Sequence, residues 1–110
     1  MTSLLSTALV AHRKRGNAHF AAGKYDEALS EYAKAMQATT DPAGTAVCQV
    51  NRALCYVRKG EWTQALGDAE AALAVEPANV KAVYVKALAM AELKRYDDAI
   101  AAFKQGNEWD

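Results

Sequence analysis

Apolar residues return along this chain every three or four positions, the spacing that places them on one face of an α-helix. The same pattern starts again after about 34 residues, a period that is typical of repeated helical hairpins. Short stretches that contain glycine or charged residues interrupt it at Gly23-Lys24, Gly60-Glu61 and Lys94-Arg95. The pattern therefore predicts six helices joined by tight turns, near residues 3–22, 25–38, 43–59, 62–75, 79–93 and 96–108.

The hairpins can be aligned through their small residues. Ala28, Ala65 and Ala99 occupy one position of the second helix, and each follows an aromatic residue by three positions. Small residues let two helix backbones approach closely, while larger apolar side chains fill the space between hairpins. The corresponding small residues of the first helices are Gly16, Ala53 and Ala87.

These features resemble the tetratricopeptide repeat family, whose pattern is matched at Ala53, Tyr56, Ala65 and Pro77. The resemblance covers nearly the whole chain. It implies an all-α fold in which three helix-turn-helix repeats stack as a right-handed α-solenoid. We expect a single domain over residues 1–110, with repeats near 9–42, 46–79 and 80–110. One departure is Lys94, where the other two copies turn with Gly23 and Gly60.

The length of 110 residues and a hydrophobic content of 52% suit one small domain with a continuous core. No stretch approaches the roughly 18 apolar residues that span a bilayer, so we expect no membrane contact. Cys48 and Cys55 lie about 10 Å apart along one helix, too far for a disulfide, which fits the reducing cytoplasm. Residues 1–25 lack acids and faintly resemble a mitochondrial presequence, but Gly16 within them already belongs to the repeat.

The sequence offers little for catalysis. His12 and His19 share a helix face without a carboxylate or thiolate at ligand spacing, so we expect no metal site and no cofactor. There is no glycine-rich phosphate loop, nucleophile elbow or acid–base pair in a suitable context. We therefore expect a protein that is not an enzyme and has no nucleic-acid partner.

The equal numbers of acids and bases, 13 of each, hide a segregation of charge between the two helices of each hairpin. In this family the first helices line the concave side, so the resemblance implies a basic groove that attracts acidic ligands. The alternative is that these charges are only solvated helix faces. The first helices carry Arg13, Lys14, Arg15, Arg52, Arg58, Lys59, Lys81, Lys86 and Lys94 against Glu92, and the second carry Asp26, Glu27, Glu31, Glu61, Asp68, Glu70, Asp97, Asp98 and Glu108 against Lys34 and Lys104.

Four polar residues in this expected groove resemble the carboxylate clamp of co-chaperone tetratricopeptide domains, which hold the C-terminal Glu-Glu-Val-Asp of heat-shock chaperones. They are Arg13, Asn17, Asn51 and Lys81, with Arg13 standing where a lysine is usual. Asn amides and cationic side chains donate hydrogen bonds to carboxylates, so these residue types suit a free C-terminus.

Val85 departs from many clamp domains, which carry a second basic residue there. One branch of the family, the chaperone-binding ubiquitin ligase with a U-box, also has an apolar residue at that place. Residues 51–56 and 80–82 look most like that branch, although this chain has no U-box. We expect apolar groove walls from Phe20, Val50, Leu54, Tyr84 and Val85; the alternative is that some of them only support helix packing.

The expected partner is therefore the C-terminal peptide of a heat-shock chaperone. An alternative is a scaffold subunit whose groove binds an internal peptide, and a catalytic domain such as a U-box in a longer parent chain would be a third possibility. The apolar side of the last repeat, around Ile100, Phe103 and Trp109, has no covering helix and suggests self-association. The acidic tail ending at Asp110 could also dock in the groove of a neighbouring molecule.

Overall fold

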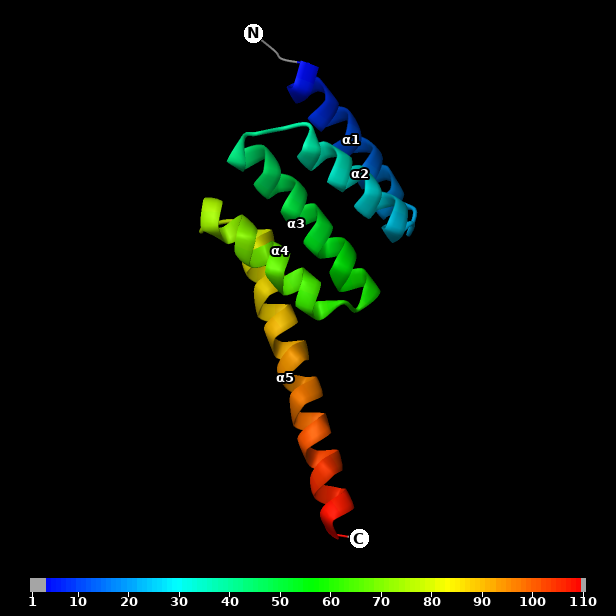
Figure 1. Cartoon of the computed structure of the whole chain (residues 1–110), viewed down its shortest axis with the longest axis vertical. Helices are drawn as coiled ribbons and strands as arrows, with labels where there is room; N and C mark the ends of the chain where they lie inside the picture. Colours follow the sequence, from blue (N-terminus) through cyan, green and yellow to red (C-terminus); the bar gives the residue numbers. More distant parts are fainter. Residues whose placement is uncertain (1–3, 110) are drawn as a thin grey trace.

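The computed structural model describes the backbone of residues 4–109 and the side chains of residues 7–101 and 104. Within this range the chain forms only helices, which stack side by side as two antiparallel hairpins followed by one long helix (Figure 1). The all-α architecture of stacked helical hairpins expected from the sequence is thereby confirmed. The helices are α1 (Leu4–Ala21), α2 (Tyr25–Gln37), α3 (Pro42–Lys59), α4 (Trp62–Val75) and α5 (Val80–Trp109).

Glycine makes the turn within each hairpin. Gly23 and Gly60 have φ angles of 77° and 73°, in the left-handed region that glycine enters without steric cost. The N–H of Gly60 bonds back to the carbonyl of Val57 at 3.0 Å. Between the hairpins, Asp41 accepts a hydrogen bond from the N–H of Ala43 at 3.1 Å and Pro42 follows it in the first helical turn. Asp41 is therefore the N-cap of α3.

The turn predicted at Lys94-Arg95 is wrong, because α5 runs through it without a break. This third position lacks the glycine of the other two, and Lys and Arg are good helix formers. Pairs within the helix also support it: Lys94 lies 3.7 Å from Asp98, and Arg95 lies 3.4 Å from Glu92. The predicted helices 79–93 and 96–108 are therefore one helix, and its second half runs clear of the body (Figure 1). The limits of the three repeats stay a prediction.

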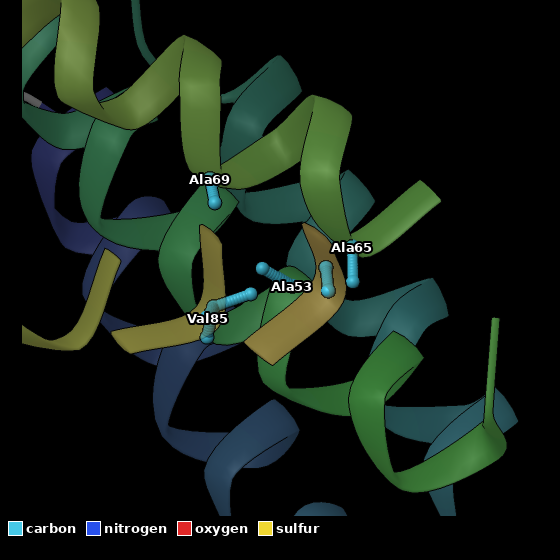
Figure 2. Packing of buried hydrophobic residues seen from close by; sticks show 5 residues of the cluster. Ala53, Ala65, Ala69 and Val85 are labelled. Atoms are coloured by element: carbon cyan, nitrogen blue, oxygen red, sulfur yellow. The ribbon is translucent and has the colours of Figure 1, made fainter. Parts of the chain in front are cut away.

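Alanine dominates the core between the stacked helices. Ala53, Ala65 and Ala69 are fully buried with Val85 where α3, α4 and α5 meet, as Figure 2 shows. Such short side chains bring helix backbones together and leave room for partly buried neighbours such as Trp62. A second buried cluster joins Ala46, Val50, Ala72 and Ala82, and a third joins Ala28, Tyr32 and Cys55.

In the first hairpin, α1 and α2 approach each other closely at Gly16. A Cβ atom added at Gly16 would stand 2.5 Å from Cε1 of Tyr32, closer than real Cβ contacts allow. Gly16 thus lets the ring of Tyr32 approach the backbone of α1 closely. Gly16 is one of the small residues expected from the sequence at a contact between helices. The close approach there also brings Tyr32 beside Asn17.

Candidate functional site

Two hollows adjoin each other where α3 faces the start of α5. The larger has a volume of about 380 Å³ and an apolar wall from Val47, Val50 and Val80. Asn51 and Lys81 supply polar groups at its edge, together with Asn79. The smaller hollow, of about 140 Å³, continues from the same Asn51 and Lys81. These two residues therefore stand at the junction, where one ligand could reach both hollows.

The smaller hollow has a mixed lining. Phe20 from α1 and Leu54 from α3 form its apolar part, and Tyr32 from α2 contributes a ring with a hydroxyl group. Phe20 is held in place from outside: the ring of Tyr25 meets it edge-on with centroids 5.5 Å apart, and the guanidinium carbon of Arg58 lies 5.8 Å from its centroid. Four helices thus converge on this small space.

Tyr32 connects Asn17 to the site. The Tyr32 hydroxyl donates a hydrogen bond to Oδ1 of Asn17 at 2.6 Å. Because the carbonyl end of the amide is engaged in this way, its NH₂ end is left as a donor. Burial raises the pKa of Tyr32 to about 12, so the hydroxyl keeps its proton and its donor role at neutral pH. Asn17 itself is exposed.

The other residues expected in the groove lie in different surroundings. Arg13 is half-buried on α1, one turn before Asn17, and is not part of the lining of either hollow. Tyr84 is 60% exposed on α5 and also lies outside both linings. Val85 is fully buried in the core against α3 and α4, so its side chain packs helices together rather than forming a groove wall.

The segregation of charge is partly neutralised within the fold. Arg52 pairs with the buried carboxylate of Asp68 through two hydrogen bonds of 2.8 and 2.6 Å, so its charge serves the contact between α3 and α4. Lys59 reaches Asp26 of the neighbouring hairpin at 2.5 Å. Lys81, in contrast, is exposed and forms no ion pair with another residue of the described part of the chain. Its charge remains available at the junction of the hollows.

Sequence reasoning missed several residues of this site. Tyr32, a core residue by its burial, also lines the smaller hollow and orients Asn17. Val47, Asn79 and Val80 line the larger hollow. A signal was available for Asn79, because it precedes α5 and caps it: its Oδ1 accepts from the N–H of Ala82 at 3.0 Å. That capping position also places the residue beside Lys81.

Cys48 and Cys55 are both free and fully buried, and they lie apart from the two linings. Burial raises the pKa of both thiols, that of Cys55 to about 11. Both side chains therefore pack in the interior as small apolar groups. Among the residues that the structure describes, we find neither a cluster of His, Cys, Asp and Glu suited to a metal ion nor a helix long and apolar enough to cross a membrane.

The stacked hairpins and their polar-edged hollows define an all-α helical-repeat protein with a groove between repeats. Models of the tetratricopeptide repeat match residues 6–76 and 50–107. The chain therefore belongs to the tetratricopeptide repeat family.

Curated relatives match most of this chain but are much longer. Protein unc-45 homolog B of Xenopus tropicalis is 32% identical over 87 residues, which are 79% of this chain and 9% of that protein. Mitochondrial import receptor subunit TOM34 of Rattus norvegicus is 33% identical over 97 residues, which are 84% of this chain and 31% of that protein. The chain thus spans less than a third of either relative.

Solved structures show the same fold. The first tetratricopeptide domain of Spaghetti (RPAP3), bound to the HSP90 peptide SRMEEVD, has a TM-score of 0.74 and 33% identity, covering 86% of this chain and 74% of that one. The second such domain of human RPAP3, in complex with the HSP70 peptide SGPTIEEVD, has a TM-score of 0.74 and 26% identity. That match covers 92% of this chain and 82% of the other.

Proposed function

We propose that this chain is a non-enzymatic interaction module of the co-chaperone or adaptor type. Its ligand is an acidic C-terminal peptide of a heat-shock chaperone, held in the groove between α3 and the start of α5, and its place of action is the cytoplasm. The observation that carries this proposal is the junction of two hollows at Asn51 and Lys81. There, an amide donor and an exposed cation stand beside apolar walls.

The chemistry of the junction suits a free carboxylate. Lys81 supplies an ammonium group and Asn51 an amide, and both can donate to carboxylate oxygens. Asn17 adds a further donor, since Tyr32 already engages its carbonyl oxygen. A charge-assisted hydrogen bond contributes about 1.5–3 kcal/mol, so a few of them give a short peptide a modest and reversible affinity. Arg13 strengthens the attraction through its charge.

The apolar walls suit the side chain next to the terminal residue. Val47, Val50 and Val80 surround a space that is large enough for an aliphatic side chain, and Phe20 and Leu54 line the neighbouring one. A ligand that ends in an aliphatic residue followed by Asp would place both of its features at the junction. The peptides in the related structures end in Glu-Val-Asp, which supports this interpretation.

Peptide titration by calorimetry or fluorescence anisotropy tests the proposal. The peptide SRMEEVD with a free C-terminus is expected to bind saturably, and its amidated form at least about tenfold more weakly because one charged acceptor is lost. Lys81→Glu is expected to abolish binding. Lys86→Glu is the matched control: it makes the same charge change on α5 but lies five residues on, about 140° around the helix. Its affinity should stay within a fewfold.

Two outcomes would count against this function. Equal binding of the free and amidated peptides would mean that the groove takes an internal segment, as in a scaffold subunit. An equal loss in Lys81→Glu and Lys86→Glu would mean that overall charge, rather than the junction, attracts the peptide. The affinity should also fall as salt is raised, because the attraction of exposed charges is screened.

A further inference from the structure

Self-association through the end of the last repeat stays a prediction, because the side chains of Phe103, Trp109 and Asp110 lie outside the described part of the chain. The first hairpin, in contrast, places a polar group directly beside the candidate site.

That group is the amide of Asn17, at the rim of the smaller hollow. The hydroxyl group of Tyr32 donates a hydrogen bond to Oδ1 of Asn17 over 2.6 Å. Tyr32 also lines the smaller hollow together with Asn51 and Lys81. The Asn17 amide therefore lies one hydrogen bond away from the lining in which the carboxylate of a ligand would sit.

Packing fixes the position of Tyr32. This residue is only 1% exposed and belongs to a buried cluster with Ala28 and Cys55. On the side of α1, its ring lies so close to Gly16 that a Cβ atom there would stand 2.5 Å from Cε1. Because interiors are packed this closely, the ring cannot turn away without opening the first hairpin. Its hydroxyl group therefore stays beside Asn17.

The buried hydroxyl group determines which end of the Asn17 amide it meets. Burial raises the pKa of Tyr32 to about 12, so the hydroxyl group keeps its proton at neutral pH. Within the described part of the chain, Asn17 is the one hydrogen-bond partner of this hydroxyl group. Turning the amide around would bring its NH₂ group to the hydroxyl oxygen and leave a buried O–H without an acceptor, which is costly. The NH₂ end of the amide therefore remains for the ligand.

A donor held in this way distinguishes a free C-terminus from a carboxamide. A carboxylate presents only acceptors, which suit the NH₂ group of Asn17. A carboxamide also presents an NH₂ group of its own, and two donors that face each other form no hydrogen bond. If the Asn17 amide could turn, its oxygen would accept from that NH₂ group and the groove would take either ligand.

We propose that Tyr32 is a positioning residue for ligand selectivity. Its hydroxyl group holds the Asn17 amide as a donor, and the groove thereby prefers a free C-terminal carboxylate over a carboxamide or the peptide bond of an internal segment. This inference rests on the proposed function. The charge of Lys81 supplies the rest of the preference, since it attracts the ionised carboxylate alone.

Tyr32→Phe tests this role, because it keeps the ring over Gly16 and removes only the hydroxyl group. Fluorescence anisotropy measures binding of SRMEEVD with a free and with an amidated C-terminus. We expect the affinity for the free acid to fall about fivefold and that for the amidated peptide to change less than about twofold, so the preference shrinks. Tyr56→Phe is the matched control. It makes the same change in a half-buried ring that packs in the core and lines neither hollow, and its preference should equal that of the wild type.

Asn17→Ala shows whether the two residues act together. Loss of the amide should reduce the preference by itself. Adding Tyr32→Phe to this variant should reduce it no further, because the hydroxyl group then has no amide to orient. A purely structural role of Tyr32 would instead weaken both peptides equally in either background, which would overturn the inference. Circular dichroism with urea unfolding checks that each variant is folded under the binding conditions.

Two further results would overturn the inference, and they separate it from the proposed function. If the wild-type chain prefers the free acid and Tyr32→Phe prefers it to the same extent, other groups select the ligand and the proposed function stands. If the wild-type chain binds neither peptide, or both equally, the proposed function fails and the selectivity role of Tyr32 fails with it.

Discussion

The two hairpins and α5 arise from the same repeat pattern, yet they end in different structures. Gly23 and Gly60 turn the chain back after the first helix of each hairpin, with φ angles of 77° and 73°. Lys94 occupies the equivalent position in the third copy, and the helix continues. A repeat pattern thus indicates where helices can pack, whereas the turn depends on a residue that tolerates a left-handed backbone.

The same comparison holds for the small residues that join the helices. Gly16 is buried beneath Tyr32, and Ala53 is fully buried beneath α4. Ala87, their counterpart in α5, is exposed, and no second helix of the described part of the chain lies over it. This small-residue position is therefore part of the packing in the hairpins but not in α5. Substitutions in the hairpins should therefore destabilise the fold more than comparable substitutions in α5.

Enlarging the small residue should have the largest effect. Gly16→Val adds a Cβ atom that would stand 2.5 Å from Cε1 of Tyr32, so α1 and α2 must separate. We expect a loss of about 3 kcal/mol or more in the free energy of unfolding. Ala87→Val should change it by less than about 0.5 kcal/mol. Urea unfolding followed by circular dichroism measures both, and similar losses would mean that α5 is covered in solution.

Removing a buried ion pair should come next. Arg52→Ala leaves the carboxylate of Asp68, only 6% exposed, without its two hydrogen bonds. The expected cost is about 2 kcal/mol, below the range for fully buried pairs because Arg52 is partly exposed. Arg95→Ala removes an exposed ion pair of α5 for comparison: its partner Glu92 is 3.4 Å away and Arg95 is 76% exposed, so the change should cost almost nothing.

Replacing both Arg52 and Asp68 distinguishes the effect of the unpaired carboxylate from the effect of lost packing around Arg52. Arg52→Met combined with Asp68→Leu removes both charges and keeps apolar volume, so most of the lost stability should return. If the double variant were as unstable as Arg52→Ala, the loss would come from packing around Arg52 rather than from the unpaired carboxylate.

Four of the helices were predictable closely from the sequence, because short-range signals mark where they end. Each of these ends at a signal that acts within a few residues: Gly23, the Asp41 cap, Gly60 and the segment around Pro77. The turn predicted at Lys94-Arg95 was wrong because such a short-range signal is missing there. There the expected turn came from the repeat register alone, and no residue at that place favours a turn over a helix.

The candidate site was predictable only in part. The resemblance indicated Asn51 and Lys81, and both line the hollows. Apolar spacing could not show that Val85 faces α3 and α4, because it does not say on which side a neighbouring helix lies. Nor could a count of charges show that Arg52 is engaged by Asp68. Both facts depend on contacts between residues distant in sequence.

Replacing the turn glycine Gly60 measures the cost of a positive φ angle without any steric clash of the new side chain. A Cβ atom at Gly60 would meet nothing within 4 Å, so the cost of Gly60→Ala comes from its φ of 73°. We expect a loss of about 1 kcal/mol in the free energy of unfolding. Lys94→Ala, at the equivalent place in α5, should be neutral within about 0.5 kcal/mol because alanine suits a helix. A destabilisation by Lys94→Ala that matched Gly60→Ala would indicate a turn in the third repeat too.

The smallest effect concerns acid stability, where the first hairpin again differs from α5. Glu31 of α2 lies 2.7 Å from Nδ1 of His12 in α1, and this hydrogen bond holds the pKa of Glu31 below its usual value of 4.5. A carboxyl group whose pKa is lower in the folded state stabilises the fold at pH values above its unfolded-state pKa. This stabilisation is lost as the pH falls through the folded-state pKa. The equivalent residues of the third repeat are Val83 and Ala102, which do not titrate.

Unfolding by urea at a series of pH values below about 5 measures this contribution. The wild-type chain should lose stability more steeply with falling pH than His12→Ala, in which Glu31 has lost its partner and its pKa moves back towards 4.5. Val83→Ala serves as the control in α5, and its pH profile should run parallel to that of the wild type. If the profile of His12→Ala ran parallel as well, the contact between His12 and Glu31 would contribute nothing to the acid sensitivity of the first hairpin.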